Sequence, residues 1–277
     1  MRNIILHGHI FKNAGTSLDW SLARSFGDAF LDHRDDQAMR RHGGRHLAEV
    51  LADNRDLMAL SSHHLPRDVP ALPGVRLHCI YLLRHPLLRI RSVYDFEREQ
   101  QADTLGARAA KRMSFPEYVA WRMEPDTPPT IRNFQTFYLS KKKPSRARPA
   151  RILPLFFDAL VFAQSLPVVG IVELYDQSMV LLEEKLRPHL PTLDLAYIPQ
   201  NVSGNPVAAV DEGQRVALIL QELGDLGKTV IDNNSHDLAL YQAALETLTV
   251  ATGRVPDFAG KLADFRERCQ MLRGKRR

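Results

Sequence analysis

The sequence predicts an α/β fold, in which helices pack on both faces of a central, mostly parallel sheet. The first observation is a set of short apolar runs bounded by turn or polar residues, typical of strands buried in a parallel sheet. The second is that segments with helical patterning separate these runs. The length of 277 residues, with 44% hydrophobic and 25% charged residues, is typical of a folded globular protein and excludes disordered, collagen and coiled-coil classes.

The expected strands, in chain order, span residues 3–7, 57–61, 75–83 and 168–172. Helices are expected at 17–25, 45–53, 87–101 and 115–123. Beyond Tyr175, apolar residues recur at three- and four-residue spacing, which predicts further helices at 177–186, 212–223 and 236–251. We therefore expect a single domain over residues 1–260 with a helical C-terminal portion, followed by a basic tail at 261–277.

The excess of basic over acidic residues comes from one segment of the chain. Lys and Arg number 37 against 32 Asp and Glu, which gives a net charge of +5. Residues 261–277 hold seven basic and two acidic residues, a surplus that equals the whole net charge. The remainder is balanced, so we expect no nucleic-acid partner, and we expect the segment from Arg266 to be frayed.

A second basic cluster lies at 141–151, where six basic residues and two prolines occur without an acidic residue. The prolines predict a loop. Two interpretations remain open. The loop could contact an anionic acceptor such as a uronate-bearing or sulfated glycan, or it could be solvated without a binding role.

The cysteines and the N-terminus indicate the compartment. Cys79 and Cys269 are far apart and show no metal-ligand spacing, so neither a disulfide framework nor a zinc site is expected. The first apolar stretch, residues 4–6, is too short for a signal sequence, and no window is apolar enough to cross a membrane. These features predict a cytoplasmic protein without a transmembrane segment.

The first motif is a strand that runs into a turn of small residues and then a helix. Small residues allow backbone N–H groups to approach an anion closely, and the helix dipole favours negative charge there. The lysine precedes the glycine, unlike the nucleotide P-loop, in which it follows the second glycine. The alternative is a plain strand–turn–helix with a capping hydroxyl. The motif comprises Lys12, Asn13, Ala14, Gly15, Thr16 and Ser17.

The second motif begins at the end of the strand predicted for residues 75–83. Arg84 follows this strand directly, Pro86 starts the next helix, and Ser92 lies two turns into that helix. Ligands bind at the carboxyl ends of strands in open parallel sheets. Arg84 and Ser92 are therefore expected to converge on one anion.

Together the two motifs resemble those of the sulfotransferases that use 3′-phosphoadenylyl sulfate (PAPS). The family's opening pattern, roughly P-K-[TS]-[GA]-[GT]-T-S, is similar to residues 11–17, although Phe11 replaces proline and Asn13 replaces a hydroxyl residue. Its second pattern, R-[DH]-P-x-x-R-x-x-S-x-Y, matches residues 84–94. The likeness is greatest to the glycan-modifying branch that includes heparan sulfate 2-O-sulfotransferase. Weaker similarities occur at 133–136, 169–173, 201–203 and 237–241.

The resemblance implies a P-loop NTPase-like, three-layer domain that transfers a sulfuryl group from PAPS to an acceptor hydroxyl on a carbohydrate or another small molecule. Residues 12–17 would hold the 5′-phosphosulfate, with Lys12 neutralising the departing oxygen. Arg84 and Ser92 would hold the 3′-phosphate, and Ser203 would add a contact. The product would be 3′,5′-bisphosphoadenosine (PAP), and no metal is required by such a reaction.

Transfer to a hydroxyl needs a general base that titrates near neutral pH, for which histidine is suited. His63 and His64 follow the strand predicted for residues 57–61, and the resembling branch places its base at the end of this strand. Ser62-His63 fits that pattern better, but His64 stays open, as does a surface position without a role for both. His7 is expected to be a hydrogen-bonded core residue, whereas His9 could line the site.

Several alternatives compete with these assignments. Asn133 and Gln135 could be either acceptor contacts or buried hydrogen-bonding groups. For the chain as a whole, a P-loop-type nucleotide kinase or NTPase is disfavoured by the lysine placement. A non-catalytic polyanion-binding module that uses the basic clusters is the third hypothesis.

Overall fold

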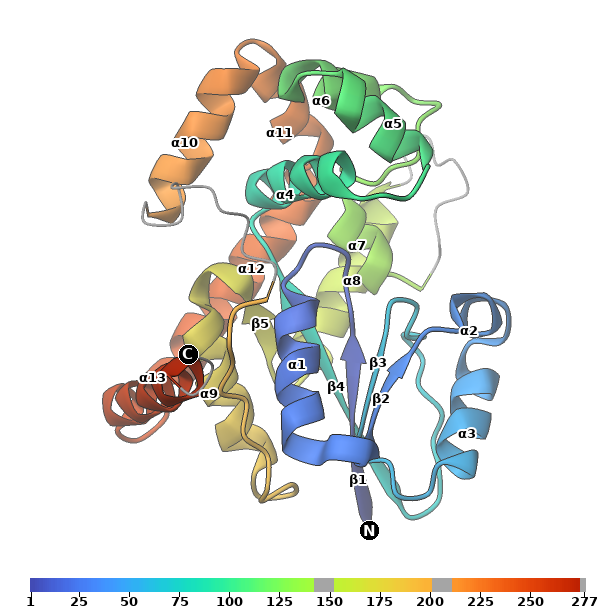
Figure 1. The fold of residues 1–277 in the computed structure, drawn as a ribbon, viewed down its shortest axis with the longest axis vertical. Helices are drawn as coiled ribbons and strands as arrows, with labels where there is room; N and C mark the ends of the chain where they lie inside the picture. Colours follow the sequence, from blue (N-terminus) through green and yellow to red (C-terminus); the bar gives the residue numbers. More distant parts are fainter. Residues whose placement is uncertain (142–151, 201–210, 275–277) are drawn as a thin grey trace. The chain divides into compact units, whose positions relative to one another are not determined.

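The computed structural model describes residues 1–141, 152–200 and 211–274 (Figure 1). The chain divides into two compact units. Unit 1 comprises Met1–Leu83, Val161–Asn201 and Ala244–Arg277, and unit 2 comprises Arg84–Leu160 and Val202–Ala243. The sheet belongs to unit 1, whereas the described part of unit 2 is helical.

The sheet of unit 1 has five strands in the order β2-β3-β1-β4-β5, and every neighbouring pair is parallel. The predicted α/β class is thereby confirmed. All four expected strands are present. The sheet has one additional strand, β2, a short edge strand that the sequence did not predict. The strands are β1 (Arg2–Gly8), β2 (Phe30–His33), β3 (Ala59–Ser62), β4 (Val75–Leu83) and β5 (Val169–Ile171).

The strand order places a topological switch point at β1. From β1 the chain adds β2 and β3 on one side, and it then crosses to add β4 and β5 on the other. In open parallel sheets, ligands bind beyond the carboxyl ends of the strands at such a point. The turn that follows β1, which contains the first motif, therefore lies where this fold places a binding site.

Helix α1 lies beside strands β2 and β3 of the sheet, and it buries apolar side chains as the central strand β1 does. Leu18 and Leu22 of the first helix are fully buried, as are Ile4 and Leu6 of the strand. Helix α1 ends at Phe26, and Gly27, which has a positive φ of 54°, begins the short 3-10 helix η1 (Gly27–Ala29). The unit contains α1 (Gly15–Phe26), α2 (Asp36–His42), α3 (Gly44–Asp53), η3 (Val172–Leu174), α9 (Tyr175–Leu186) and α13 (Phe258–Gly274).

Unit 2 is organised around a buried ion pair. Arg122 and Glu97 are joined at 2.7 Å, and the Tyr118 hydroxyl bonds to both. Gly106 lies against the pair, since a Cβ there would fall 2.3 Å from the Glu97 oxygens. The helices of this unit are α4 (Pro86–Glu99), α5 (Leu105–Arg112), α6 (Phe115–Met123), α7 (Phe134–Leu139), α10 (Glu212–Leu223) and α11 (Leu226–Asn233), while α8 (Ile152–Ser165) and α12 (Ser235–Gly253) run from one unit into the other.

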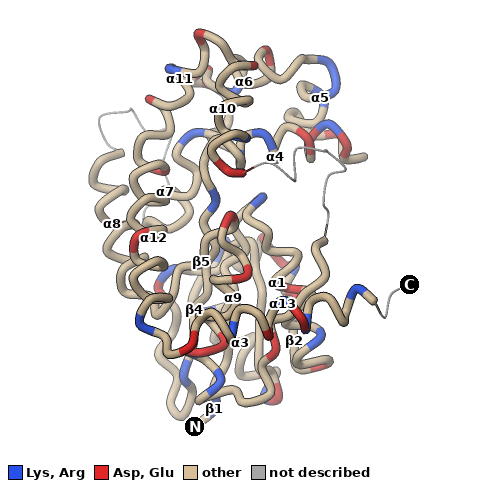
Figure 2. Tube along the Cα trace, turned by 90° about the vertical axis from the view of Figure 1, so that its left-hand side faces the viewer, with Lys and Arg blue, Asp and Glu red and all other residues tan. Residues whose placement is uncertain are grey.

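The expectation of a frayed segment from Arg266 is wrong. Residues up to Gly274 form helix α13, which buries Phe265 and Cys269. Arg266 and Arg268 pair with carboxylates of α9 at 3.1 and 2.8 Å, and Lys261 pairs with Glu184. Figure 2 shows basic and acidic positions interleaved along the chain. Ion pairs with carboxylates of α9, far away in the sequence, therefore hold the basic residues Lys261, Arg266 and Arg268 in place.

Two further expectations concern surface segments. The basic loop predicted at 141–151 lies outside the described residues except for Lys141, whose N–H donates to Asp158 at 2.6 Å. Within the part of the chain that the structure describes, we find no helix with the length and apolar character needed to span a membrane. The single domain predicted over 1–260 stays a prediction.

Candidate active site

The turn between β1 and α1 has an unusual backbone. Lys12 and Ala14 have positive φ values of 65° and 57°, in the left-handed region that non-glycine residues rarely adopt. The N–H of Ile10 donates to the carbonyl of Gly8 at 2.9 Å, and the N–H of Asn13 donates to the carbonyl of Ile10 at 3.2 Å. These two bonds form a tight turn. Left-handed residues in a turn that leads into a helix are a feature of anion-binding concavities.

The start of α1 lacks the usual side-chain partners. Its N-cap residue, Ala14, offers no side-chain hydrogen bond, and the first turn of this described helix contains no acidic residue. Thr16 is exposed, whereas the buried Ser17 hydroxyl accepts a bond from the N–H of Gln200 at 3.2 Å. The N-terminus of α1 therefore offers backbone N–H groups without a side-chain cap, together with the positive end of the helix dipole.

Asn13 connects the turn to the sheet. Its side chain is 1% exposed, and its amide nitrogen donates to the carbonyl of Leu82 in β4 at 2.7 Å. We conclude that Asn13 fixes the turn against β4. A contact from Asn13 to a sulfonate group stays a prediction.

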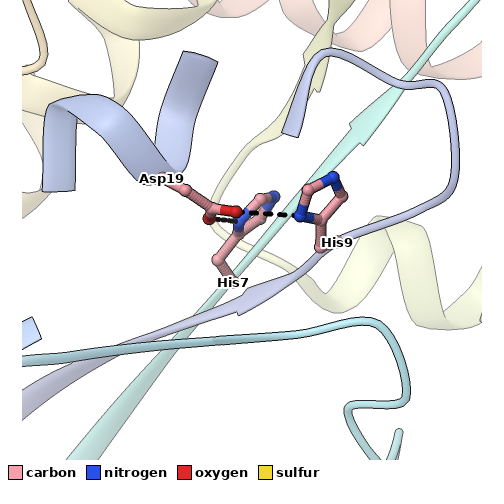
Figure 3. Close-up of side chains that lie close together, drawn as sticks. All are labelled: His7, His9 and Asp19. Carbon is pink, nitrogen blue, oxygen red and sulfur yellow. Dashed lines mark hydrogen bonds and ion pairs between the residues drawn. The ribbon is translucent and has the colours of Figure 1, made fainter. Parts of the chain in front are cut away.

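Beneath the turn, one carboxylate binds two imidazoles (Figure 3). Asp19 Oδ1 lies 2.7 Å from His7 Nδ1, and Asp19 Oδ2 lies 2.8 Å from His9 Nδ1. All three side chains are buried. Because an ionised carboxylate only accepts hydrogen bonds, Nδ1 carries the proton in both rings. The expectation of a hydrogen-bonded core histidine at position 7 is confirmed.

The charges of this triad are set by opposing effects. Burial would raise the pKa of Asp19, but the two histidines lower it well below its usual value. Burial lowers the pKa of His9, and the hydrogen bond to Asp19 only partly offsets this. At neutral pH, Asp19 is therefore ionised while His9 is neutral.

The triad also has the composition and spacing of metal ligands, because its ligand atoms lie within 4.8 Å of one another. In the structure, however, these atoms hydrogen-bond to each other, and both Nδ1 atoms carry protons rather than lone pairs. A metal would have to replace these hydrogen bonds. The triad is complete as a hydrogen-bonded group.

The two candidate bases differ in their surroundings. His63 is half-buried, and its Nδ1 lies 3.0 Å from the carbonyl oxygen of His9. A carbonyl only accepts, so Nδ1 is the donor and the lone pair of the neutral ring is on Nε2. Burial lowers the pKa of His63. His64 instead has its Nε2 3.8 Å from an oxygen of Asp36. The geometry favours His63 as the base.

In unit 2, Arg84 is held through its backbone. The N–H of Arg84 donates to Gln135 Oε1 and its carbonyl accepts from Gln135 Nε2, both at 2.9 Å. Gln135 itself is 1% exposed, and its N–H donates to the buried carboxylate of Asp237 at 3.0 Å. The amide of Asn133 accepts from the N–H of Asp237, also at 3.0 Å. The sequence left open whether Asn133 and Gln135 are acceptor contacts or buried hydrogen-bonding groups. In the structure both are buried hydrogen-bonding groups.

The remaining residues of the second motif have different environments. Arg89 is 2% exposed, donates to the carbonyl of Thr130 at 2.9 Å and stacks on Phe134, and burial lowers its pKa to about 10. It is a packed structural residue. Ser92 is half-buried in α4, and its convergence with Arg84 on one anion stays a prediction. Ser203 lies outside the described residues.

The sequence reasoning missed Asp19 as an organising residue, and it named Gln135 without its partners Arg84 and Asp237. Asp19 had a usable signal, since it falls beside Leu18 on the face of the predicted helix that should be apolar. A charged residue on such a face needs a partner. The bonds from Gln135 to Arg84 and Asp237 gave no comparable signal, because these partners are far away in the sequence.

The fold defines the class of the protein: an α/β protein with a parallel five-stranded sheet, in which a turn with two non-glycine residues of positive φ follows β1 and His63 follows β3. No family model matches the chain. It is 30% identical over 252 residues to an uncharacterized protein of Archaeoglobus fulgidus, in an alignment that covers 88% of this chain and 97% of the archaeal protein. The chain belongs to the same family as that protein.

Proposed function

We propose that the protein is a sulfotransferase that moves a sulfuryl group from PAPS to a hydroxyl of a carbohydrate acceptor. One observation carries the proposal: an anion-binding type of turn and a histidine with its lone pair on Nε2 follow two adjacent parallel strands. Gly8 of β1 pairs with Ser62 of β3. The next residues are His9, which opens the turn, and His63. The register of β1 against β3 therefore sets where His9 and His63 begin. The proposal assigns the anion turn and the base to these two positions.

The donor's 5′-phosphosulfate would be held by the turn and by the N-terminus of α1. The backbone there supplies N–H donors, and Lys12 supplies a full positive charge. As the bond between sulfur and the bridging oxygen breaks, negative charge develops on the phosphate that leaves. Lys12 neutralises this charge, which is worth most in a site that excludes water.

The acceptor hydroxyl would lose its proton to Nε2 of His63. A new bond forms between the acceptor oxygen and sulfur, the bond from sulfur to the phosphate oxygen breaks, and PAP departs with the electron pair. The proton on His63 then passes to solvent. The lowered pKa of His63 keeps it unprotonated near neutral pH, as a base requires.

The 3′-phosphate distinguishes PAPS from ordinary adenine nucleotides, and the proposal assigns it to Arg84 and Ser92. The two hydrogen bonds to the side-chain amide of Gln135 fix the backbone of Arg84. A guanidinium on a fixed backbone loses less conformational entropy when it binds a phosphate. The choice of a carbohydrate acceptor and of a cytoplasmic location rests on the sequence resemblance and composition.

The test compares nucleotides by thermal shift and then measures transfer. We expect PAP to raise the melting temperature, whereas ADP, which lacks the 3′-phosphate, and ATP with Mg²⁺ have little effect. Radiolabelled PAPS should then label a fraction of host glycans. Stabilisation by ATP with Mg²⁺ in preference to PAP would support the kinase or NTPase alternative. A response to heparin alone would support a polyanion-binding module.

A further inference from the structure

His9 lies in the middle of a row of three imidazoles. Its ring centroid is 4.1 Å from that of His63 and 5.3 Å from that of His7. It also lies against Gly15, the first residue of α1, where a Cβ would fall 2.2 Å from the His9 ring. The ring therefore fills the space between the candidate base and the start of the helix that follows the anion turn.

Asp19 fixes the orientation of this ring. Oδ2 accepts from His9 Nδ1, while Oδ1 accepts from His7 Nδ1, which is also 3.0 Å from the Ser61 hydroxyl. Rotation of the His9 ring would leave a buried, charged carboxylate oxygen without its donor, which is unfavourable. One orientation of His9 is strongly preferred for this reason.

His9 in turn fixes His63 through two contacts. Its carbonyl accepts the Nδ1 proton of His63 at 3.0 Å, which leaves the lone pair on Nε2. Its ring packs against the His63 ring and limits its rotation. The first contact sets the tautomer of the base, and the second sets its direction.

We propose that His9 and Asp19 are positioning residues for the base: His9 sets the distance between His63 Nε2 and the anion turn, and Asp19 holds His9 in place. The role of the base itself rests on the proposed function. In-line transfer is sensitive to this distance, because a displacement of about 1 Å can reduce a rate by about a hundredfold. Neither residue touches the reacting atoms in this proposal.

Three variants separate the contributions. His9→Ala keeps the backbone carbonyl but removes the ring, and we expect kcat to fall by about a hundredfold while the Kd for PAP changes by less than about threefold. His9→Phe keeps a ring but removes the donor to Asp19, and should retain more of kcat than His9→Ala. Asp19→Asn removes one acceptor oxygen at constant volume and provides the test if His9→Ala does not fold.

A spectroscopic measurement makes the inference independent of transfer. Long-range ¹H–¹⁵N NMR of the protein without nucleotide should show His63 as a single tautomer protonated at Nδ1. In His9→Ala the carbonyl acceptor remains, but the ring that limits rotation of His63 is gone. The His63 ring should then turn away from the carbonyl for part of the time, so both tautomers become populated and its two nitrogen shifts move toward each other. His78→Asn is the matched control, since His78 also bonds to a side chain, Asn3, outside the row; it should leave His63 unchanged.

The outcomes are distinct. Wild-type kcat together with unmoved His63 shifts in His9→Ala would overturn the positioning role. If the wild-type protein transfers no sulfuryl group, the proposed function fails, and the NMR result still decides whether His9 orients His63. A change in the shifts together with a selective loss of kcat supports both.

Discussion

Gln135 and Arg84 are joined by a pair of hydrogen bonds in which the amide of one residue bonds to both the N–H and the carbonyl of the other. This arrangement is the one that a neighbouring β-strand would make, but it is supplied by a single side chain from α7. Arg84 directly follows β4 in the chain, and the contact fixes the backbone from which its guanidinium extends.

The first prediction concerns this pair. Gln135→Glu replaces the donor Nε2 with a carboxylate oxygen, so the bond to the Arg84 carbonyl is lost. We expect the Kd for PAP to rise by about tenfold or more, corresponding to about 1.4 kcal/mol, the scale of one buried hydrogen bond. Isothermal titration measures this change. Gln242→Glu, on α12, is the control variant, and an equal loss of affinity there would contradict a specific role of Gln135.

The second prediction concerns Lys12. Lys12→Ala removes the charge assigned to the departing oxygen, and we expect kcat to fall by about a hundredfold or more, the scale of losing one electrostatic donor. The melting temperature should change little, because Lys12 is only half-buried. Single-turnover assays with labelled PAPS measure the rate. Lys111→Ala, in α5, is the matched control, and near-normal turnover by the Lys12 variant would refute the assignment.

The third prediction separates the two histidines by their pH dependence. Burial lowers the pKa of His63 from the ordinary value of 6.5, and the base acts when unprotonated. The rate should therefore rise as pH increases through that lowered pKa and level off above it. His63→Asn should abolish this limb of the profile along with most of kcat, whereas His64→Asn should keep it. The reverse pattern would assign the base to His64.

The fourth prediction concerns the C-terminal helix. Arg268 donates to Glu183, which is 3% exposed, and it also bonds Asp194 and Asp264. Without Arg268, the buried Glu183 keeps Arg187 as a cation at 2.9 Å but loses the guanidinium that donates to both of its oxygens. Arg268→Ala should lower the free energy of unfolding by about 2–4 kcal/mol, measured by urea titration. Arg273→Ala, near the end of the same helix, should cost less, and equal losses would argue against the pair.

Much of the fold could be predicted because its signals are local. The four longer apolar segments became strands, and helices such as α6 and α10 begin and end where the pattern predicted. Strand β2 was missed because it is short and lies at the sheet edge, where three of its four residues are not fully buried. Helix α13 was missed because its basic residues were counted without their partners in α9.

The candidate site was predictable to the level of motifs but not of contacts. The turn, Arg84 and the pair His63-His64 could be located because each follows a recognisable strand. The contacts that orient them are side chain to backbone bonds between distant segments, such as those of Asn13 to Leu82 and Gln135 to Arg84. Such bonds leave no periodicity in the sequence, so only a three-dimensional structure displays them.

The ion pairs of α13 bear on how quickly an anionic nucleotide reaches the protein. Lys261, Arg266 and Arg268 each face a carboxylate of α9, so at a distance each pair acts as a dipole, whose field decays faster than that of a single charge. These cations therefore add little to diffusional steering, despite their share of the formal charge. For the proposed PAPS site, the expected consequence is that steering depends on charges close to the turn after β1 rather than on α13.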